Sequence, residues 1–536
     1  MMNPASRPAG VRLIASVLLI LFCAVPGPAA AQGLTLGPPH FPPAPRPLLD
    51  QIPAGGIGHH FQLMDHNPLV APGGTLPRGG NGNDLAIVRN CLYASSRSNN
   101  QGTLIVDISN PRRTRVVGQI PPPGPPPSGR TLNTADMSAV ESENLLVRQV
   151  WNTSSPFDGN KMELYDTTDC FRPRLVSVLE LPNTPHEQHI WQGGNPHTVL
   201  LYVTFSNGRS PAPFPPSPRD TDLRVYDITH KTSPRGPVAE FSMQRVYGFP
   251  TREPLDVLVN AGGRQRNELH AVSTSPDKVS REGFPTQIYA AMREAGFFIL
   301  DSTALATALA GGPPCDVDPT APNPCIKKLH PALNARLDYH PPFNQSHTHS
   351  AHKVTGRPYA IVTDEPGPCP WGWVRTVFVD DETEITTDGV TSRMRGDLFP
   401  SIFGAFTIPE NLVENCPENV ARFPGASFNA HKSLVFRNLM FISWIAGGVR
   451  AIDISNPGTP FETGFYFNKP VRATEDGDVN PELGIRNHPA LKDGLLYFLD
   501  GESGLYVLQY TGPRKEEVPQ EGLFTQQQVQ VPGRQP

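Results

Sequence analysis

One short segment recurs six times along this chain and constrains the fold more than any other feature. Each copy is a run of apolar residues that ends in Asp and is followed by polar turn residues, often with Pro. The clearest copies are Leu104–Pro111 (LIVDISNP) and Val449–Pro457 (VRAIDISNP). The aspartates that end the six copies are Asp107, Asp166, Asp227, Asp301, Asp380 and Asp453, with separations of 59, 61, 74, 79 and 73 residues. This long and variable period fits a repeated four-stranded sheet with loop insertions, not a tight solenoid.

A second recurring element, rich in aromatic and β-branched residues, precedes most copies and is typical of a strand. Its examples lie at 91–94, 199–203, 287–290, 359–362, 439–442 and 495–498. We interpret the pair as the second and third strands of a propeller blade. The Asp and Asn side chains then bond turn N–H groups, and Pro fixes φ, in the turn that leads to the fourth strand.

Composition supports an all-β fold with many turns. The 536 residues include 62 Pro and 47 Gly, which excludes a helical bundle, while 38% hydrophobic residues are enough for a large core. We therefore expect a single closed β-propeller of seven four-stranded blades over residues 57–510. Closure would pair residues near 60–80 with the hairpin at 495–510, because a closed ring leaves no exposed sheet edge.

The segments TLIVDISNPRRTRVVGQI (103–120) and GVRAIDISNPGTPFETGFY (448–466) resemble LVIVD repeats. These repeats define a β-propeller family found in exported and surface proteins of bacteria and archaea. The resemblance covers roughly residues 80 to 510 and is degenerate in the middle copies. It implies a propeller but no definite reaction.

The two ends of the chain are expected to lie outside the propeller. Residues 1–31 have arginines, an apolar run (13–25) and a small-residue stretch ending at Ala31, which is the pattern of a secretory signal peptide. Residues 32–56 form a Pro-rich lead-in, and residues 511–536 are expected to be a flexible, disordered tail. The sequence thus predicts export to the periplasm or the exterior, with no membrane span after cleavage. The balance of 45 basic and 50 acidic residues gives no reason to expect nucleic acid.

Six cysteines remain after such a cleavage, and an even number in an oxidising compartment favours disulfides. Cys315 and Cys325 bracket a short Pro-rich loop and are the easiest pair. The natural remaining pairs are Cys91 with Cys170 and Cys369 with Cys416. No CxxC motif occurs, so the sequence gives no support for thiol redox catalysis or a zinc finger.

Histidines recur where the innermost strand of each blade should begin. Five successive repeats carry His at this place, and the first two carry Asp84 and Asp136 instead. The candidate metal ligands are His189, His270, His349, His352, His431 and His488. The candidate second-shell or mouth residues are Asp84, Asp136, His186, Glu187, Glu268 and His347. Since inner strands line the central channel of a propeller, these side chains should converge near one axis.

Imidazole nitrogens suit Cu, Fe or Zn, so the series predicts a His-rich axial site that could hold one transition-metal ion. A ring of four histidines is the known solution in some propeller oxygenases. For any single His the alternative is structural, namely a hydrogen bond to the backbone of a neighbouring blade.

Three function classes remain open from the sequence. The first is a binding scaffold with the axial His site, taking a small molecule or protein at a propeller face. The second is a metal-dependent oxidoreductase that uses the same cluster, and the third is a cell-surface module that binds protein or glycan. Motifs of nucleophile-elbow hydrolases, P-loop NTPases, Rossmann enzymes and HExxH proteases are missing from the sequence, which excludes those readings.

Overall fold

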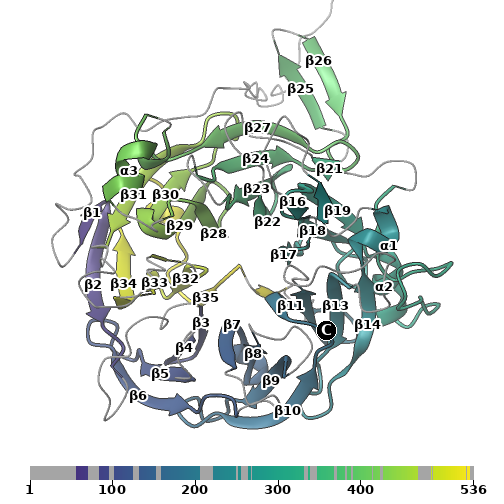
Figure 1. Cartoon of the computed structure of the whole chain (residues 1–536), viewed down its shortest axis with the longest axis horizontal. Coiled ribbons are helices and arrows are strands. Elements are labelled where there is room, and N and C mark those ends of the chain that lie inside the picture. The colour runs from purple at the N-terminus through teal and green to yellow at the C-terminus, as the bar shows by residue number, and fades with distance from the viewer. Residues whose placement is uncertain are drawn as a thin grey trace, which may run out of the picture. The chain divides into compact units, whose positions relative to one another are not determined.

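The computed structural model shows a ring of seven antiparallel sheets, the seven-bladed β-propeller that the repeats predict (Figure 1). The structure describes residues 56–70, 84–95, 102–124, 132–152, 159–205, 221–248, 252–254, 264–266, 268–330, 336–337, 347–366, 371–380, 383–387, 390–412, 414–422, 427–468, 484–485, 487–501, 503–526 and 528–530. The predicted signal peptide, nearly all of the lead-in and residues 531–536 lie outside these ranges.

Each blade has four strands, and the first of them lies innermost, at the central channel. Blade 1 is β3 (Leu85–Val88), β4 (Cys91–Ser95), β5 (Thr103–Asp107) and β6 (Arg115–Ile120). Blade 2 is β7 (Asn133–Val140), β8 (Leu145–Trp151), β9 (Lys161–Asp166) and β10 (Arg174–Glu180). Blade 3 is β11 (Pro185–Gly193), β12 (Thr198–Phe205), β13 (Leu223–Asp227) and β14 (Arg235–Phe241). Blade 4 is β17 (Ala271–Ser273), β18 (Gln287–Ala291), β19 (Phe297–Asp301) and β20 (Lys327–Lys328), with β21 (Arg336–Leu337) also paired to β19.

The remaining three blades complete the ring. Blade 5 is β22 (Thr348–Lys353), β23 (Tyr359–Asp364), β24 (Val374–Phe378) and β27 (Ser401–Phe406). Blade 6 is β28 (Ala430–Val435), β29 (Leu439–Trp444), β30 (Gly448–Asp453) and β31 (Phe461–Phe467), extended by β1 (Ile57–His59). Blade 7 is β32 (Ala490–Lys492), β33 (Leu495–Asp500) and β34 (Gly504–Tyr510), with β2 (Phe61–Asn67) as its outermost strand. The expected closure is confirmed, because β2 pairs with β34 from Phe61 opposite Tyr510 to Asn67 opposite Leu505.

Short elements decorate the blades. The helices are α1 (Met243–Tyr247), α2 (Thr303–Leu309), α3 (Cys416–Arg422), η2 (Glu141–Glu143), η3 (Pro409–Asn411), η4 (Ile445–Gly447) and η5 (Lys515–Glu517). Two separate hairpins are formed by β15 (Arg252–Pro254) with β16 (Arg264–Arg266), and by β25 (Thr383–Thr387) with β26 (Val390–Met394).

The recurring aspartates end the third strands, as the repeat predicts. Five of the six are the last residue of the third strand, whereas Asp380 lies two residues beyond the end of β24. The carboxylates of the five accept hydrogen bonds from the N–H two residues on, at Ser109, Thr168, Thr229, Thr303 and Ser455. The Asp thus closes the turn locally, which explains its recurrence without any functional role.

The core lies between the faces of neighbouring blades. Leu92 of blade 1 packs in one cluster with Leu499 of blade 7, and Phe441 of blade 6 packs in another with Leu508 of blade 7. All four side chains are buried. Apolar contacts between blades therefore hold the ring together and leave the inner edges free to carry polar groups.

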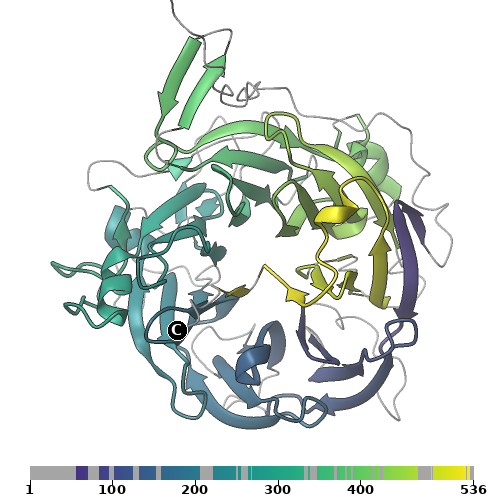
Figure 2. The same ribbon diagram turned by 180° about the vertical axis from the view of Figure 1, so that it is seen from behind.

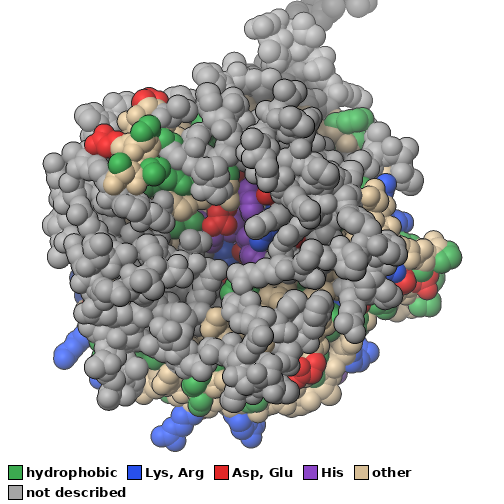
Figure 3. All heavy atoms as spheres, viewed as in Figure 1, with side chains coloured by type: hydrophobic (Ala, Val, Ile, Leu, Met, Phe, Trp, Pro, Cys, Tyr) green, Lys and Arg blue, Asp and Glu red, His purple; other side chains and the backbone are tan. Residues whose placement is uncertain are grey.

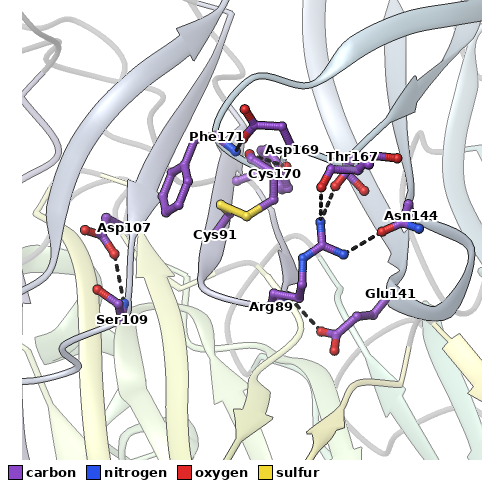
Figure 4. Close-up of a disulfide and its surroundings, with 12 residues drawn as sticks. Arg89, Cys91, Asp107, Ser109, Glu141, Asn144, Thr167, Asp169, Cys170 and Phe171 are labelled. Carbon is purple, nitrogen blue, oxygen red and sulfur yellow. Dashed lines mark hydrogen bonds between the residues drawn. A yellow bond between two sulfur atoms is a disulfide. The ribbon is translucent and has the colours of Figure 1, made fainter.

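Two of the predicted disulfides are present. Cys91 on β4 is bonded to Cys170 in the turn after β9, so this bridge joins blades 1 and 2 (Figure 4). The side chain of Arg89 supports the same junction by donating hydrogen bonds to Asn144 and to the carbonyl of Thr167. Cys315 is bonded to Cys325 within blade 4. For the third predicted pair, Cys416 is disulfide-bonded, while Cys369 lies outside the described residues.

The C-terminal segment differs from the flexible tail that we expected for 511–536. After β34 the chain forms η5, then β35 (Leu523–Phe524), which pairs with β32, and β36 (Gln528–Gln530), which pairs in parallel with β11. We call residues 523–526 and 528–530 the strap, because they cross the centre of the ring from blade 7 to blade 3 (Figures 1 and 2). The low apolar content of this segment predicted disorder. The strap is instead held by main-chain hydrogen bonds to the inner strands β11 and β32, and such bonds do not require apolar side chains.

Candidate functional site

Irregular pairing marks the start of four inner strands. The register with the second strand shifts between Thr134 and Met137 in β7, Pro185 and Gln188 in β11, Thr348 and Ser350 in β22, and Ala430 and Ser433 in β28. Each interval contains a predicted site residue, namely Asp136, Glu187, His349 and His431. A β-bulge bends a strand locally and changes the direction of its side chains. All four residues therefore lie in an irregular backbone segment at the same channel mouth.

Hydroxyl groups of the second strands hold these strand starts in place. In blade 3, Thr204 accepts a hydrogen bond from the N–H of Glu187 (2.9 Å) and donates one to the carbonyl of His270 in blade 4 (2.8 Å). In blade 6, Ser443 plays the same part toward the N–H of Lys432 (3.1 Å) and the carbonyl of Asn487 in blade 7 (3.1 Å). Each hydroxyl thereby fixes a channel residue in its own blade and ties it to the next blade.

Four imidazoles from successive blades form a row at this mouth. The ring centroids are 4.1 Å apart for His186 and His270, 4.1 Å for His270 and His349, and 4.0 Å for His349 and His431. We call these four histidines, with Glu187 and Glu365, the mouth cluster. The space-filling view from this side shows histidine, acidic and basic side chains gathered in the central hollow (Figure 3).

Two carboxylates accompany the row. Glu187 Oε1 lies 3.6 Å from His270 Nδ1 and 3.8 Å from His349 Nε2. The carboxylate of Glu365 lies 3.8 Å from His349 Nε2 and 3.7 Å from His431 Nε2. Two groups have ligand atoms that all lie within 4.8 Å of one another and could hold a metal ion, namely His186–Glu187–His270 and His270–His349–Glu365.

An arginine that the sequence analysis missed contacts the row from one side. Arg293 donates hydrogen bonds to His347 Nε2 (2.8 Å) and His186 Nε2 (3.2 Å), and its Nε is 3.6 Å from Glu268. His347 also lies 3.3 Å from Glu294. His347 and Glu268, predicted as mouth residues, therefore form an ionic network with Arg293 beside the mouth cluster.

A buried lysine, also missed, joins opposite sides of the channel. Lys432 Nζ lies 3.4 Å from Asp136 of blade 2 and 3.2 Å from Glu187 of blade 3. Burial lowers the pKa of Lys432, but the charges of Asp136, Glu187 and Asp84 more than offset it, so the net shift is upward and the ammonium is retained. The other carboxylate of the first two blades, Asp84, accepts a hydrogen bond from the N–H of Met137 (3.1 Å) and so bridges blades 1 and 2.

Burial sets the protonation of the cluster. It raises the pKa of Glu187 to about 8, against the opposing charge of Lys432. It lowers the pKa values of His270 and His349 well below 6.5, helped by the neighbouring positive and imidazole groups. Both imidazoles are therefore neutral at pH 7, which is the form that binds metals.

The other predicted histidines lie apart from the two metal-capable groups. His352 and His488 contact each other, with ring centroids 5.8 Å apart. Burial lowers the pKa of His352 to about 3, and neither of its ring nitrogens has a hydrogen-bond partner among the described residues. We expected all the predicted histidines to converge in one place. They instead lie at two levels along the channel, the mouth cluster and a deeper pair.

His189 has a structural role in the described part of the chain. Its Nε2 accepts a hydrogen bond from the N–H of Thr274 (3.2 Å), and its ring is also bonded to the main chain of Gln526 in the strap. The Gln526 side chain in turn accepts a hydrogen bond from the N–H of Val435 in blade 6 (3.1 Å). His189 thereby links the strap to blades 3 and 4 and is committed to these partners.

No protein-family model matches this chain. No curated protein matches it either. Among solved structures, Sqt1 of Saccharomyces cerevisiae is similar at 8% sequence identity with a TM-score of 0.40, covering 81% of this chain and 96% of that one. Within the described residues, no helix has both the length and the apolar character needed to cross a membrane.

Proposed function

We propose that this protein is an exported LVIVD-type β-propeller whose mouth cluster binds a transition metal. The observation that carries the proposal is the convergence of His186, His270 and His349 with Glu187 and Glu365, in groups whose ligand atoms lie within 4.8 Å of one another. Mixed imidazole and carboxylate donors suit Zn, Fe and Cu(II). Export is supported by the two disulfides, which persist in oxidising compartments.

Single-residue variants test the metal site. The wild-type protein, purified without chelators, should contain Cu, Fe or Zn by mass spectrometry, and His270→Ala should lower the content at least tenfold because His270 belongs to both groups. The control is His197→Ala, since His197 is half exposed and pairs with Glu143 outside both metal-capable groups. Equal metal content in the two variants, or none in the wild type, would contradict the proposal.

Metal affinity should rise steeply with pH and level off above about 8. A proton on Glu187, whose pKa burial raises to about 8, competes with a bound cation, so affinity should increase about 100-fold from pH 6 to pH 9. Zn²⁺ titration by calorimetry at several pH values measures this. In Glu187→Gln the dependence should be nearly flat, and an unchanged slope in that variant would assign the proton to another group.

A further inference from the structure

We infer that the mouth cluster takes two divalent transition-metal ions, with His270 shared between them. This inference rests on the proposed function and deepens it. His186 and Glu187 belong only to the first metal-capable group, His349 and Glu365 only to the second, and His270 to both. The structure therefore offers two overlapping sites with one residue in common.

The position of His270 suits a shared ligand. Its ring centroid is 4.1 Å from that of His186 on one side and 4.1 Å from that of His349 on the other. An imidazole has two ring nitrogens, and both ligate metals when the neutral ring releases its remaining N–H proton to solvent on binding the second ion and becomes an imidazolate. His270 is almost wholly buried, and its Nδ1 has no hydrogen-bond partner among the described residues. The carboxylate of Glu187 lies 3.6 Å from this nitrogen.

Each metal-capable group has its own carboxylate. Glu187 approaches His270 and His349, whereas Glu365 approaches His349 and His431. Neither metal-capable group of the described residues contains both His186 and His349, so one ion in either group leaves the other group unused. Two ions, each with one carboxylate and one histidine besides His270, use both groups, and His431 lies beside the second at 3.7 Å from Glu365.

The net charge of the residues around the cluster also favours two metal ions. The described residues in and around the cluster include more acidic than basic side chains. The acidic ones are Asp84, Asp136, Glu187, Glu268, Glu294 and Glu365, and the basic ones are Arg293 and Lys432. With Glu187 ionised once a bound cation displaces its proton, the formal surplus is about four negative charges, or about five with His270 as imidazolate, against the four positive charges of two divalent cations.

Metal stoichiometry tests the inference. The full-length protein is stripped with chelator, loaded with Zn²⁺, desalted and analysed for metal per chain, and wild type should retain two equivalents. Glu187→Gln and Glu365→Gln should each retain one, and His270→Ala should retain none. The matched control is Glu143→Gln, because Glu143 pairs with His197 at the surface and should leave two equivalents in place. Circular dichroism establishes that each variant is folded.

Loading with Cu²⁺ gives a second measurement that does not depend on retention. In electron paramagnetic resonance, two neighbouring Cu²⁺ ions should couple magnetically and give a half-field resonance in the wild type. The two glutamine variants should give the uncoupled signal of a single Cu²⁺ ion. One equivalent in the wild type, lost in both glutamine variants, would overturn the two-ion inference while leaving the proposed metal site intact. No retained metal in the wild type would overturn both.

Discussion

Acidifying the metal-free protein from pH 7 to pH 5.5 should lower its free energy of unfolding by about 4 kcal/mol. Burial holds the pKa values of five channel histidines far below 6.5 in the folded state. These residues are His189, His270, His349, His352 and His488. The unfolded chain protonates each of them below about pH 6.5, which costs the folded state a little over ~1 kcal/mol per residue over this interval.

Glu187 acts in the opposite direction. Because burial raises its pKa from 4.5 to about 8, the folded state gains stability as the pH falls through that window, by about 2 kcal/mol between pH 7 and pH 5.5. The histidines outnumber it, so destabilisation by acid wins. Urea unfolding at several pH values, with chelator present, measures the slope. His352→Gln should reduce it and His197→Gln should not, and a stability that stays constant from pH 7 to pH 5.5 would show that these imidazoles are not held neutral.

Replacing Lys432 with Met should cost about 3–5 kcal/mol of stability. The substitution keeps the volume of the buried side chain but leaves Asp136 and Glu187 without their shared cation. Adding Asp136→Asn to Lys432→Met should restore part of the loss, since it removes the carboxylate that has lost its partner cation. Chemical denaturation at pH 7.5 measures both variants.

Lys327→Met is the matched control for this experiment. Lys327 pairs with Asp301 at 3.6 Å, but its side chain is 48% exposed, so the loss should be below about 1 kcal/mol. Similar losses at positions 432 and 327 would show that the buried ion pairs of Lys432 do not support the fold.

The repeats made most of the fold predictable. The Asp-ended copies locate the third strands, and the aromatic copies locate the second strands, because each motif depends on contacts within its own blade. Ring closure by β2 could also be anticipated, since an open ring would expose two sheet edges. The strap could not, because main-chain pairing leaves little trace in a segment such as Gln528–Gln530.

The candidate site was predictable in part, for geometric reasons. The inner strand start gave His270, His349 and His431, but the chain rises about 3.3 Å per residue along a strand, so His349 and His352 reach different depths. Glu365 follows the end of β23, which returns to the same mouth, and Arg293 lies in the turn after β18. Residues that reach a site from the ends of other strands carry no periodic signal in the sequence. Glu365 indicates that a search for them should begin at the position directly after each second strand.

The strap also sets an order in time. β2 precedes every blade along the chain and closes the ring. The strap follows every blade and crosses the centre of the ring. His189 acquires its bond to Gln526 only after all seven blades have been synthesised. A nascent chain that stops at blade 7 would have all the histidines of the channel but not their final support. The final support of the centre therefore depends on a segment that lies after all seven blades in the sequence.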